Sequence, residues 1–271
     1  MRAVRIGDIG VGGDNPVRLM GVINNSPESF FKGSFVPPGS VLDAASRMID
    51  AGAEIIDVGA RSTAPGSMQI PVSEECERLK QTLEELVGSG IPVSVDTMHP
   101  DALSVALRYD IDAINDIHGL SDPHYADIAA DSGLPVITMA AVEKPGDASG
   151  TVETLAALAL VLDRAVRHGI DELILDPGIG RWVQTRSVQD DWDLCGRFSE
   201  FSIFERPLLC AISRKSFIGD LLGKPAEERL AGSLAVTALL IAAGADMIRT
   251  HDIPETKDVI TVSAELLQRR A

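Results

Sequence analysis

One pattern recurs along this chain: a short apolar run ends at a polar residue, a loop follows, and a helical segment begins. The clearest case is residues 173–176, where Leu-Ile-Leu-Asp precedes Pro177 and Gly178. Such an apolar run bounded by turn residues indicates a buried strand. Proline has no amide donor and glycine permits a turn, so the strand must end at Asp176 and present its carboxylate there.

Eight runs of this kind alternate with loop and helical segments, without a break in composition. Alternation of strand and helix is typical of a parallel sheet covered by helices. We therefore predict that residues 1–271 form a single domain, a closed (β/α)₈ TIM barrel. An open doubly wound sheet is the alternative, and the absence of a Gly-x-Gly-x-x-Gly turn after the first strand disfavours it. The predicted strands are 17–22, 54–58, 92–95, 113–115, 135–138, 173–176, 207–211 and 246–248.

Other segments complete the predicted fold. Residues 3–6 and 9–11 predict a short N-terminal β-hairpin that plugs the bottom of the barrel. The segment 230–248 is apolar, but its pattern changes from helix to strand at Gly244, which favours a buried helix and strand over a membrane span. A further helix is expected to start at Ser73. The remaining expected helices include 41–51, 152–168 and 255–269.

Composition limits the classes of function. The chain has 271 residues, 45% of them hydrophobic, which suffices for a large core, and its net charge is −16. A nucleic-acid surface needs clustered Lys and Arg, so this class is disfavoured, whereas a few local cations could still bind a small anion. The three cysteines have neither metal-ligand nor disulfide spacing, and the N-terminus lacks the apolar core of a signal peptide. These features predict a cytoplasmic protein without a membrane anchor.

Polar residues gather at or just after the predicted C-terminal ends of the strands. In a barrel these ends surround one mouth, where active sites lie. A carboxylate accepts two hydrogen bonds side by side, so Asp96, Asn115 and Asp176 suit an amino-substituted nitrogen heterocycle. The full set of polar residues is Asn24, Thr63, Asp96, Asn115, Asp176, Lys215, Arg249 and His251.

Three of these residues are expected to act as cations. Lys215, Arg249 and His251 follow neighbouring strands of an otherwise acidic protein and predict a clamp for phosphate or diphosphate. Asn24 offers a neutral oxygen that could help to hold Mg²⁺ beside the diphosphate.

Seven short strings follow one another along the chain. They are Met20-Gly21-Val22-Ile23-Asn24-Asn25-Ser26-Pro27-Glu28-Ser29-Phe30, Asp57-Val58-Gly59 with Ser62-Thr63, Ser94-Val95-Asp96-Thr97, Ile114-Asn115-Asp116-Ile117, Asp176-Pro177-Gly178-Ile179-Gly180, Ser213-Arg214-Lys215-Ser216-Phe217-Ile218-Gly219 and Arg249-Thr250-His251-Asp252. In these strings and in their order, the sequence resembles the dihydropteroate synthase family over nearly its full length.

The resemblance implies a transferase that joins 6-hydroxymethyl-7,8-dihydropterin diphosphate to 4-aminobenzoate or a related arylamine and releases diphosphate, with Mg²⁺ near Asn24. It also implies a homodimer, for which the apolar helix starting at Leu230 is a candidate surface. The catalytic residues would be Asp96, Lys215 and Arg249. The pterin would contact Asp96, Asn115, Asp176, Lys215 and Arg249. The diphosphate would contact Asn24, Thr63, Arg249 and His251.

Departures from the family pattern concentrate in the loops that would close over the amine. We therefore expect a standard pterin half and an altered arylamine half. Either Arg61 or Lys32 replaces the lost cations for 4-aminobenzoate, or the amine is a ribosyl-phosphate derivative such as methanogens use. The departures are Glu28, Lys32, Arg61, Ala64-Pro65-Gly66, Thr138-Met139-Ala140 and Arg181-Trp182-Val183.

Two alternatives use the same acceptor residues. One is a pterin-dependent methyltransferase domain, and the other is a non-catalytic pterin-binding protein. The strings 213–216 and 249–251 favour diphosphate chemistry, because methyl transfer releases no anion.

Overall fold

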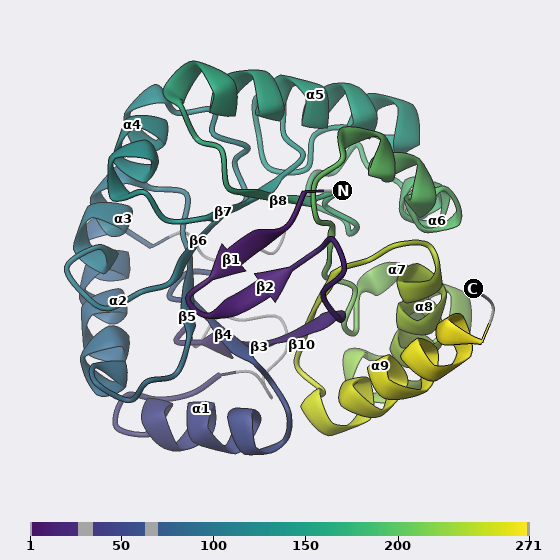
Figure 1. The fold of residues 1–271 in the computed structure, drawn as a ribbon, viewed down its shortest axis with the longest axis horizontal. Helices are drawn as coiled ribbons and strands as arrows, with labels where there is room; N and C mark the ends of the chain where they lie inside the picture. Colours follow the sequence, from purple (N-terminus) through teal and green to yellow (C-terminus); the bar gives the residue numbers. More distant parts are fainter. Residues whose placement is uncertain (1, 27–34, 63–69, 270–271) are drawn as a thin grey trace.

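The computed structural model describes residues 2–26, 35–62 and 70–269. Its eight parallel strands follow the order β8-β7-β6-β5-β4-β3-β10-β9. A bridge between Leu175 and Leu208 brings the two ends of this sheet together, so the predicted TIM barrel is confirmed (Figure 1). The strands are β3 (Arg18–Asn24), β4 (Ile55–Gly59), β5 (Val93–Asp96), β6 (Ala113–Asp116), β7 (Val136–Met139), β8 (Leu173–Asp176), β9 (Leu209–Cys210) and β10 (Met247–Thr250).

Helices surround the strands as a ring (Figure 1). The α2 helix begins at Val72 rather than at Ser73, because the carbonyl of Pro71 already accepts the first helical hydrogen bonds; the prediction of Ser73 as the start was wrong. The helices are α1 (Val41–Asp50), α2 (Val72–Leu86), α3 (Pro100–Ala106), α4 (Pro123–Ser132), α5 (Gly150–His168), α6 (Val188–Gly196), α7 (Ser216–Leu222), α8 (Leu230–Ala242) and α9 (Ile253–Gln268), with 3₁₀ turns at Phe198–Phe204 and Ala226–Glu228.

The predicted hairpin is present and closes one end of the barrel. Strands β1 (Val4–Ile6) and β2 (Ile9–Val11) pair antiparallel and lie across the strand ends (Figure 1). Their apolar side chains pack on a layer of inward-facing strand residues, which excludes water from this end. That layer consists of Met20, Ile55, Ala113, Ile137, Ile174, Leu209 and Met247. Alternate strand residues face outward and pack against the helices.

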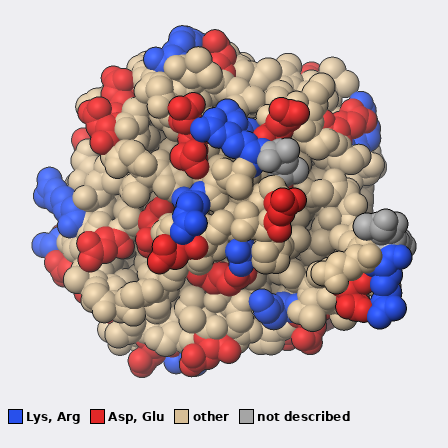
Figure 2. Space-filling view, in the orientation of Figure 1, with Lys and Arg blue, Asp and Glu red and all other residues tan. Residues whose placement is uncertain are grey.

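The surface charges of one face and the apolar segment that starts at Leu230 can be compared with the sequence. On the face shown in Figure 2, acidic and basic side chains are interspersed, and no broad basic area is visible. The segment 230–248 divides into α8 and β10 as predicted. Within residues 2–26, 35–62 and 70–269, no helix is long and apolar enough to cross a membrane.

Candidate active site

The candidate site is the layer of side chains directly above the apolar barrel core. Side chains two residues apart on a strand face the same side. Asp57 lies two residues after Ile55, which belongs to the apolar layer. The same step places Asn115, Asp176 and Arg249 above it. A cavity of about 580 Å³ opens here, at the C-terminal ends of the strands.

Seven of the eight predicted site residues line this one cavity. Thr63 lies outside the described residues, as do loop positions Glu28 and Lys32. The seven are Asn24, Asp96, Asn115, Asp176, Lys215, Arg249 and His251.

Arg249 bridges two carboxylates at the cavity floor. Its Nε donates to Asp57 Oδ2 at 2.6 Å, and its Nη2 donates to Asp96 Oδ2 at 2.8 Å. Asn115 Nδ2 donates to the same oxygen of Asp57 at 3.0 Å. Asp57 is absent from the site residues predicted from the sequence, although its position two residues after an inward-facing isoleucine indicates that it belongs to the site.

Burial changes the proton affinity of the acidic groups. It raises the pKa of Asp96 to about 7, with Arg249 opposing this shift and Asp57 adding to it. It also raises the pKa of Asp176, which the positive charge of Lys215 opposes. A ligand that brings positive charge or hydrogen-bond donors to these two carboxyls would therefore favour their ionised form.

Among the described residues, no carboxylate pairs directly with Lys215. Its ammonium donates to the carbonyl of Ile179 and lies 5.0 Å from the centre of the Trp182 ring. Asp176 Oδ1 instead accepts the amide of Gly178 at 2.7 Å. Burial lowers the pKa of Lys215, and the charge of Asp176 opposes that shift.

Burial disfavours the positive charge that the sequence predicted for His251. Burial lowers its pKa to about 4, and the adjacent charge of Arg249 adds to the shift. Its Nδ1 lies 3.1 Å from Ser213 Oγ. Near neutral pH the uncharged form of His251 is therefore favoured, and it offers hydrogen bonds beside the cations Arg249 and Lys215.

Arg61, one of the two predicted substitute cations, pairs with a buried carboxylate. Its Nε donates to Glu75 Oε2 at 2.8 Å, and its Nη2 donates to the carbonyl of Ile70 at 2.6 Å. Thr97 and His99 contact Glu75 as well, at 2.6 and 2.8 Å. Arg61 borders the cavity, but these contacts disfavour it as a substitute cation for the amine.

Buried contacts fix the loop after β8 on both sides of its exposed residue Arg181. Arg186 and Asp191 form a buried ion pair at 3.1 Å, and Asp191 Oδ1 accepts the amide of Gly180 at 2.8 Å. Trp182 Nε1 donates to the carbonyl of Gly178 at 2.9 Å. Between these anchors Arg181 is exposed, borders the cavity and has no ion-pair or hydrogen-bond partner among the described residues.

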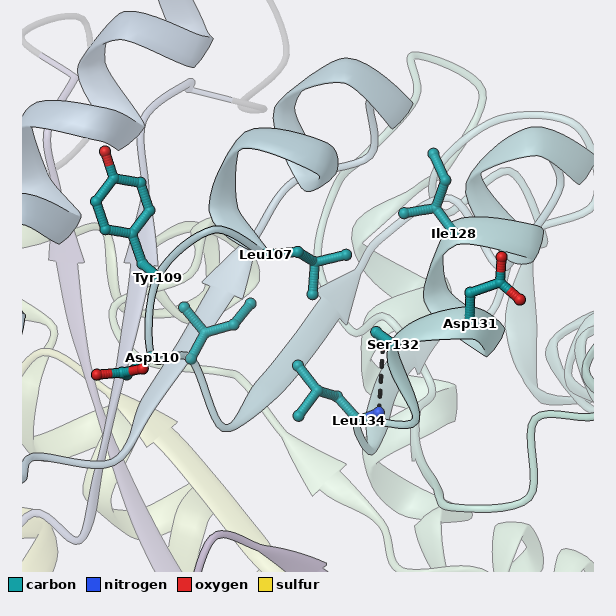
Figure 3. Close-up of a pocket in the computed structure, with 8 residues that line it drawn as sticks. Leu107, Tyr109, Asp110, Ile128, Asp131, Ser132 and Leu134 are labelled. Atoms are coloured by element: carbon teal, nitrogen blue, oxygen red, sulfur yellow. Dashed lines mark hydrogen bonds between the residues drawn. The ribbon is translucent and has the colours of Figure 1, made fainter.

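A second pocket, of about 480 Å³, lies between the ends of α3 and α4 (Figure 3). The segments that form it lead into β6 and β7, so it lies at the opposite end of the barrel from the site. Its lining mixes apolar side chains with two hydroxyls and two carboxylates and contains no lysine or arginine, so it does not suit a diphosphate. It comprises Leu107, Tyr109, Asp110, Ile111, Ile128, Asp131, Ser132 and Leu134.

Comparison with known proteins agrees with this geometry. The family described as pterin binding enzyme matches residues 20–251. The dihydropteroate synthase of Escherichia coli K12 is 36% identical over 90% of this chain and 89% of that protein. The chain belongs to the dihydropteroate synthase family. The interpretation of the sequence as a dihydropteroate synthase-type transferase is thereby confirmed.

Two further family members extend the comparison. A probable bifunctional folylpolyglutamate synthase/dihydropteroate synthase of Haloferax volcanii is 35% identical over 90% of this chain, which spans only 30% of that longer protein. The structure of the Xanthomonas albilineans dihydropteroate synthase with 4-aminobenzoic acid has a TM-score of 0.84 and 33% identity, covering 98% of each chain. These synthases favour diphosphate chemistry over the methyltransferase alternative.

Proposed function

We propose that the cavity binds 6-hydroxymethyl-7,8-dihydropterin diphosphate and joins its exocyclic carbon to the nitrogen of an arylamine. The carbon–oxygen bond breaks, and its electron pair leaves with the diphosphate. The amine lone pair forms the new carbon–nitrogen bond, and one amine proton passes to solvent. The observation that carries this proposal is the convergence of Asp96, Asn115 and Asp176 with Lys215 and Arg249 in one cavity.

The two halves of this substrate require different groups. The acceptors Asp96, Asn115 and Asp176 suit the N–H edge of the pterin, while Lys215 can donate to its ring acceptors. Arg249 is assigned to the pterin face and to the diphosphate, whose growing negative charge it would stabilise as the bond breaks.

Asn24, His251 and Thr63 are assigned to the remaining diphosphate oxygens. Asn24 and His251 both border the cavity. The described residues hold no group of three His, Cys, Asp or Glu side chains that could bind a metal alone. Asn24 would therefore contribute one oxygen to Mg²⁺, which retains waters and takes its other ligands from diphosphate. When bound, the ion would neutralise charge on the leaving group.

Diphosphate release tests the proposed reaction. With the pterin diphosphate, Mg²⁺ and 4-aminobenzoate, the wild-type chain should release diphosphate at a rate that depends on the amine. Asp176→Asn should lose most of this activity, because the pterin loses a charged acceptor. Pterin binding without release under any amine would instead identify a non-catalytic pterin-binding protein.

The altered amine half requires an experiment of its own. Arg61 is engaged by Glu75, so the exposed Arg181 is the better candidate for a cation that faces an anionic arylamine. Turnover of 4-aminobenzoate should be compared with turnover of a ribosyl-phosphate arylamine. Equal and efficient use of plain 4-aminobenzoate would contradict a requirement for the modified amine.

We also propose a homodimer through the surface of α7, α8 and α9. Its support is that these three helices expose five large apolar side chains, which association would remove from water. They are Leu221, Leu222, Leu239, Val262 and Leu266.

We place the reaction in the cytoplasm. Cys76, Cys195 and Cys210 are all free thiols, as expected in a reducing compartment.

A further inference from the structure

We propose that Asp57 is a positioning residue. It accepts hydrogen bonds from both Nε and Nη2 of Arg249 when the pterin binds to Asp96. This inference rests on the proposed function, which assigns Asp96 to the pterin. Asp57 need not touch the substrate: it acts through the two side chains that it holds, Arg249 and Asn115.

The first support is the pair of contacts at one oxygen of Asp57. Its Oδ2 accepts from Arg249 Nε at 2.6 Å and from Asn115 Nδ2 at 3.0 Å, and the residue is fully buried. A carboxylate paired with a guanidinium accepts hydrogen bonds and donates none. The amide of Asn115 must therefore turn its nitrogen toward Asp57, which leaves its carbonyl oxygen for the ligand.

The second support is a conflict at Asp96. Arg249 Nη2 lies 2.8 Å from Asp96 Oδ2 in this structure. A pterin that donates to Asp96 must compete with that contact, and a guanidinium that left it without another acceptor would lose a charge-assisted hydrogen bond. Pterin binding is favoured if another carboxylate oxygen accepts the hydrogen bond that Arg249 Nη2 then donates.

The third support is that such an acceptor stands beside Arg249. Oδ1 of Asp57 is buried and has no hydrogen-bond partner among the described residues. The Nε–Nη2 edge of a guanidinium fits both oxygens of one carboxylate. This protein already contains that geometry, since Arg214 Nε and Nη2 lie 2.9 and 2.7 Å from the two oxygens of Asp252. Transfer of Nη2 from Asp96 to Asp57 would give Arg249 the same pairing.

Steady-state kinetics of Asp57→Asn tests the inference. An asparagine offers one acceptor oxygen, so Arg249 should stay on Asp96 and compete with the pterin. We expect KM for the pterin diphosphate to rise about tenfold or more, while KM for the amine stays within about twofold. The matched control is Glu54→Gln, which removes the carboxylate of the Arg18–Glu54 pair (2.6 Å) at the opposite end of the barrel. It should lower Tm and leave both KM values unchanged.

A double variant separates positioning from general stabilisation. Once Asp96→Asn has removed the competing carboxylate, Asp57→Asn should raise the pterin KM less than it does alone. Additive effects, or an equal rise in both KM values that follows Tm, would overturn the inference.

If Asp57→Asn does not fold, a crystal structure of the wild-type chain with the pterin diphosphate gives the answer. Arg249 should contact both oxygens of Asp57 and have left Asp96, and an intact Arg249–Asp96 contact would overturn the inference. A wild-type chain without amine-dependent release would instead refute the proposed function, whereas an active wild type with an unaffected Asp57→Asn refutes only the role of Asp57.

Discussion

The ammonium of Lys215 lies 5.0 Å from the centre of the Trp182 ring, over a loop that is itself fixed at the cavity wall. A desolvated ammonium over an indole gains about 2 kcal/mol from the ring quadrupole. The aromatic ring therefore holds Lys215 near Asp176 without neutralising its charge, and the donors that Lys215 does not use on the carbonyl of Ile179 remain for a ligand.

Replacing Trp182 should weaken pterin binding. Trp182→Ala removes the ring, and we expect KM for the pterin diphosphate to rise about tenfold, which corresponds to about 1.4 kcal/mol. Trp182→Phe keeps an aromatic face but loses the indole hydrogen bond to Gly178, so its KM should lie between that of the wild type and that of Trp182→Ala. Steady-state kinetics measures both, and an unchanged KM in Trp182→Ala would show that the ring does not position Lys215.

Turnover should depend on the ionisation of Asp96. Only its carboxylate accepts the pterin N–H groups, and its pKa is about 7, so kcat/KM for the pterin should fall as pH drops below about 7. Because folding raises the pKa of this group above its unfolded value of about 3.9, its contribution to stability is complete below about pH 4 and declines up to about pH 7. Activity and this stability contribution thus change in opposite directions. In Asp96→Asn the inflection should vanish, whereas an inflection from the substrate itself would persist.

Arg181 should select for a negative charge on the amine. With Arg181→Met, KM for an amine that carries a carboxylate or phosphate should rise about fivefold to tenfold, because the variant removes an exposed cation at the mouth. KM for the uncharged 4-aminobenzamide should not change, which provides the control. Equal effects on charged and uncharged amines would assign Arg181 to the shape of the loop rather than to charge recognition.

Glu75 should be important for stability. Glu75→Ala deprives the nearly buried Arg61 of its carboxylate and removes the acceptor of Thr97 and His99, so the free energy of unfolding should fall by about 3–5 kcal/mol. The control is the neighbouring Glu74→Ala, which breaks a more exposed pair with Arg78 and should cost less than about 1 kcal/mol. Urea denaturation compares the two, and similar losses would contradict the importance of the buried network.

The oligomeric state should depend on α8. Leu239 is 70% exposed on the proposed dimer surface, and a charge there would be buried on association. Leu239→Glu should therefore elute as a monomer in light-scattering chromatography while the wild type is a dimer. Val166→Glu, on the comparably exposed outer face of α5, should leave the dimer intact. A dimer in both variants would place the interface elsewhere.

Most of the fold and most of the site could be predicted from strand periodicity and turn residues in the sequence. The run ending at Asp176 matches β8 at both ends, because Pro177 and Gly178 leave the strand no continuation. The spacing of residues in the sequence does not, however, show which side chains form ion pairs or hydrogen bonds with one another. It could not show that Arg249 joins Asp57 to Asp96, that Glu75 engages Arg61, or that burial lowers the pKa of His251. These outcomes depend on contacts between residues far apart in the chain and on local desolvation.

Detection of the joined product tests the central claim most directly. The chain should be incubated with the pterin diphosphate, Mg²⁺ and isotopically labelled 4-aminobenzoate, and the products should be separated by mass spectrometry. We predict a labelled dihydropterin–arylamine conjugate formed in equal amount with diphosphate, and its loss in Asp176→Asn. Diphosphate release without the conjugate would contradict the account. So would a pterin diphosphate that is not consumed with 4-aminobenzoate or with the ribosyl-phosphate arylamine.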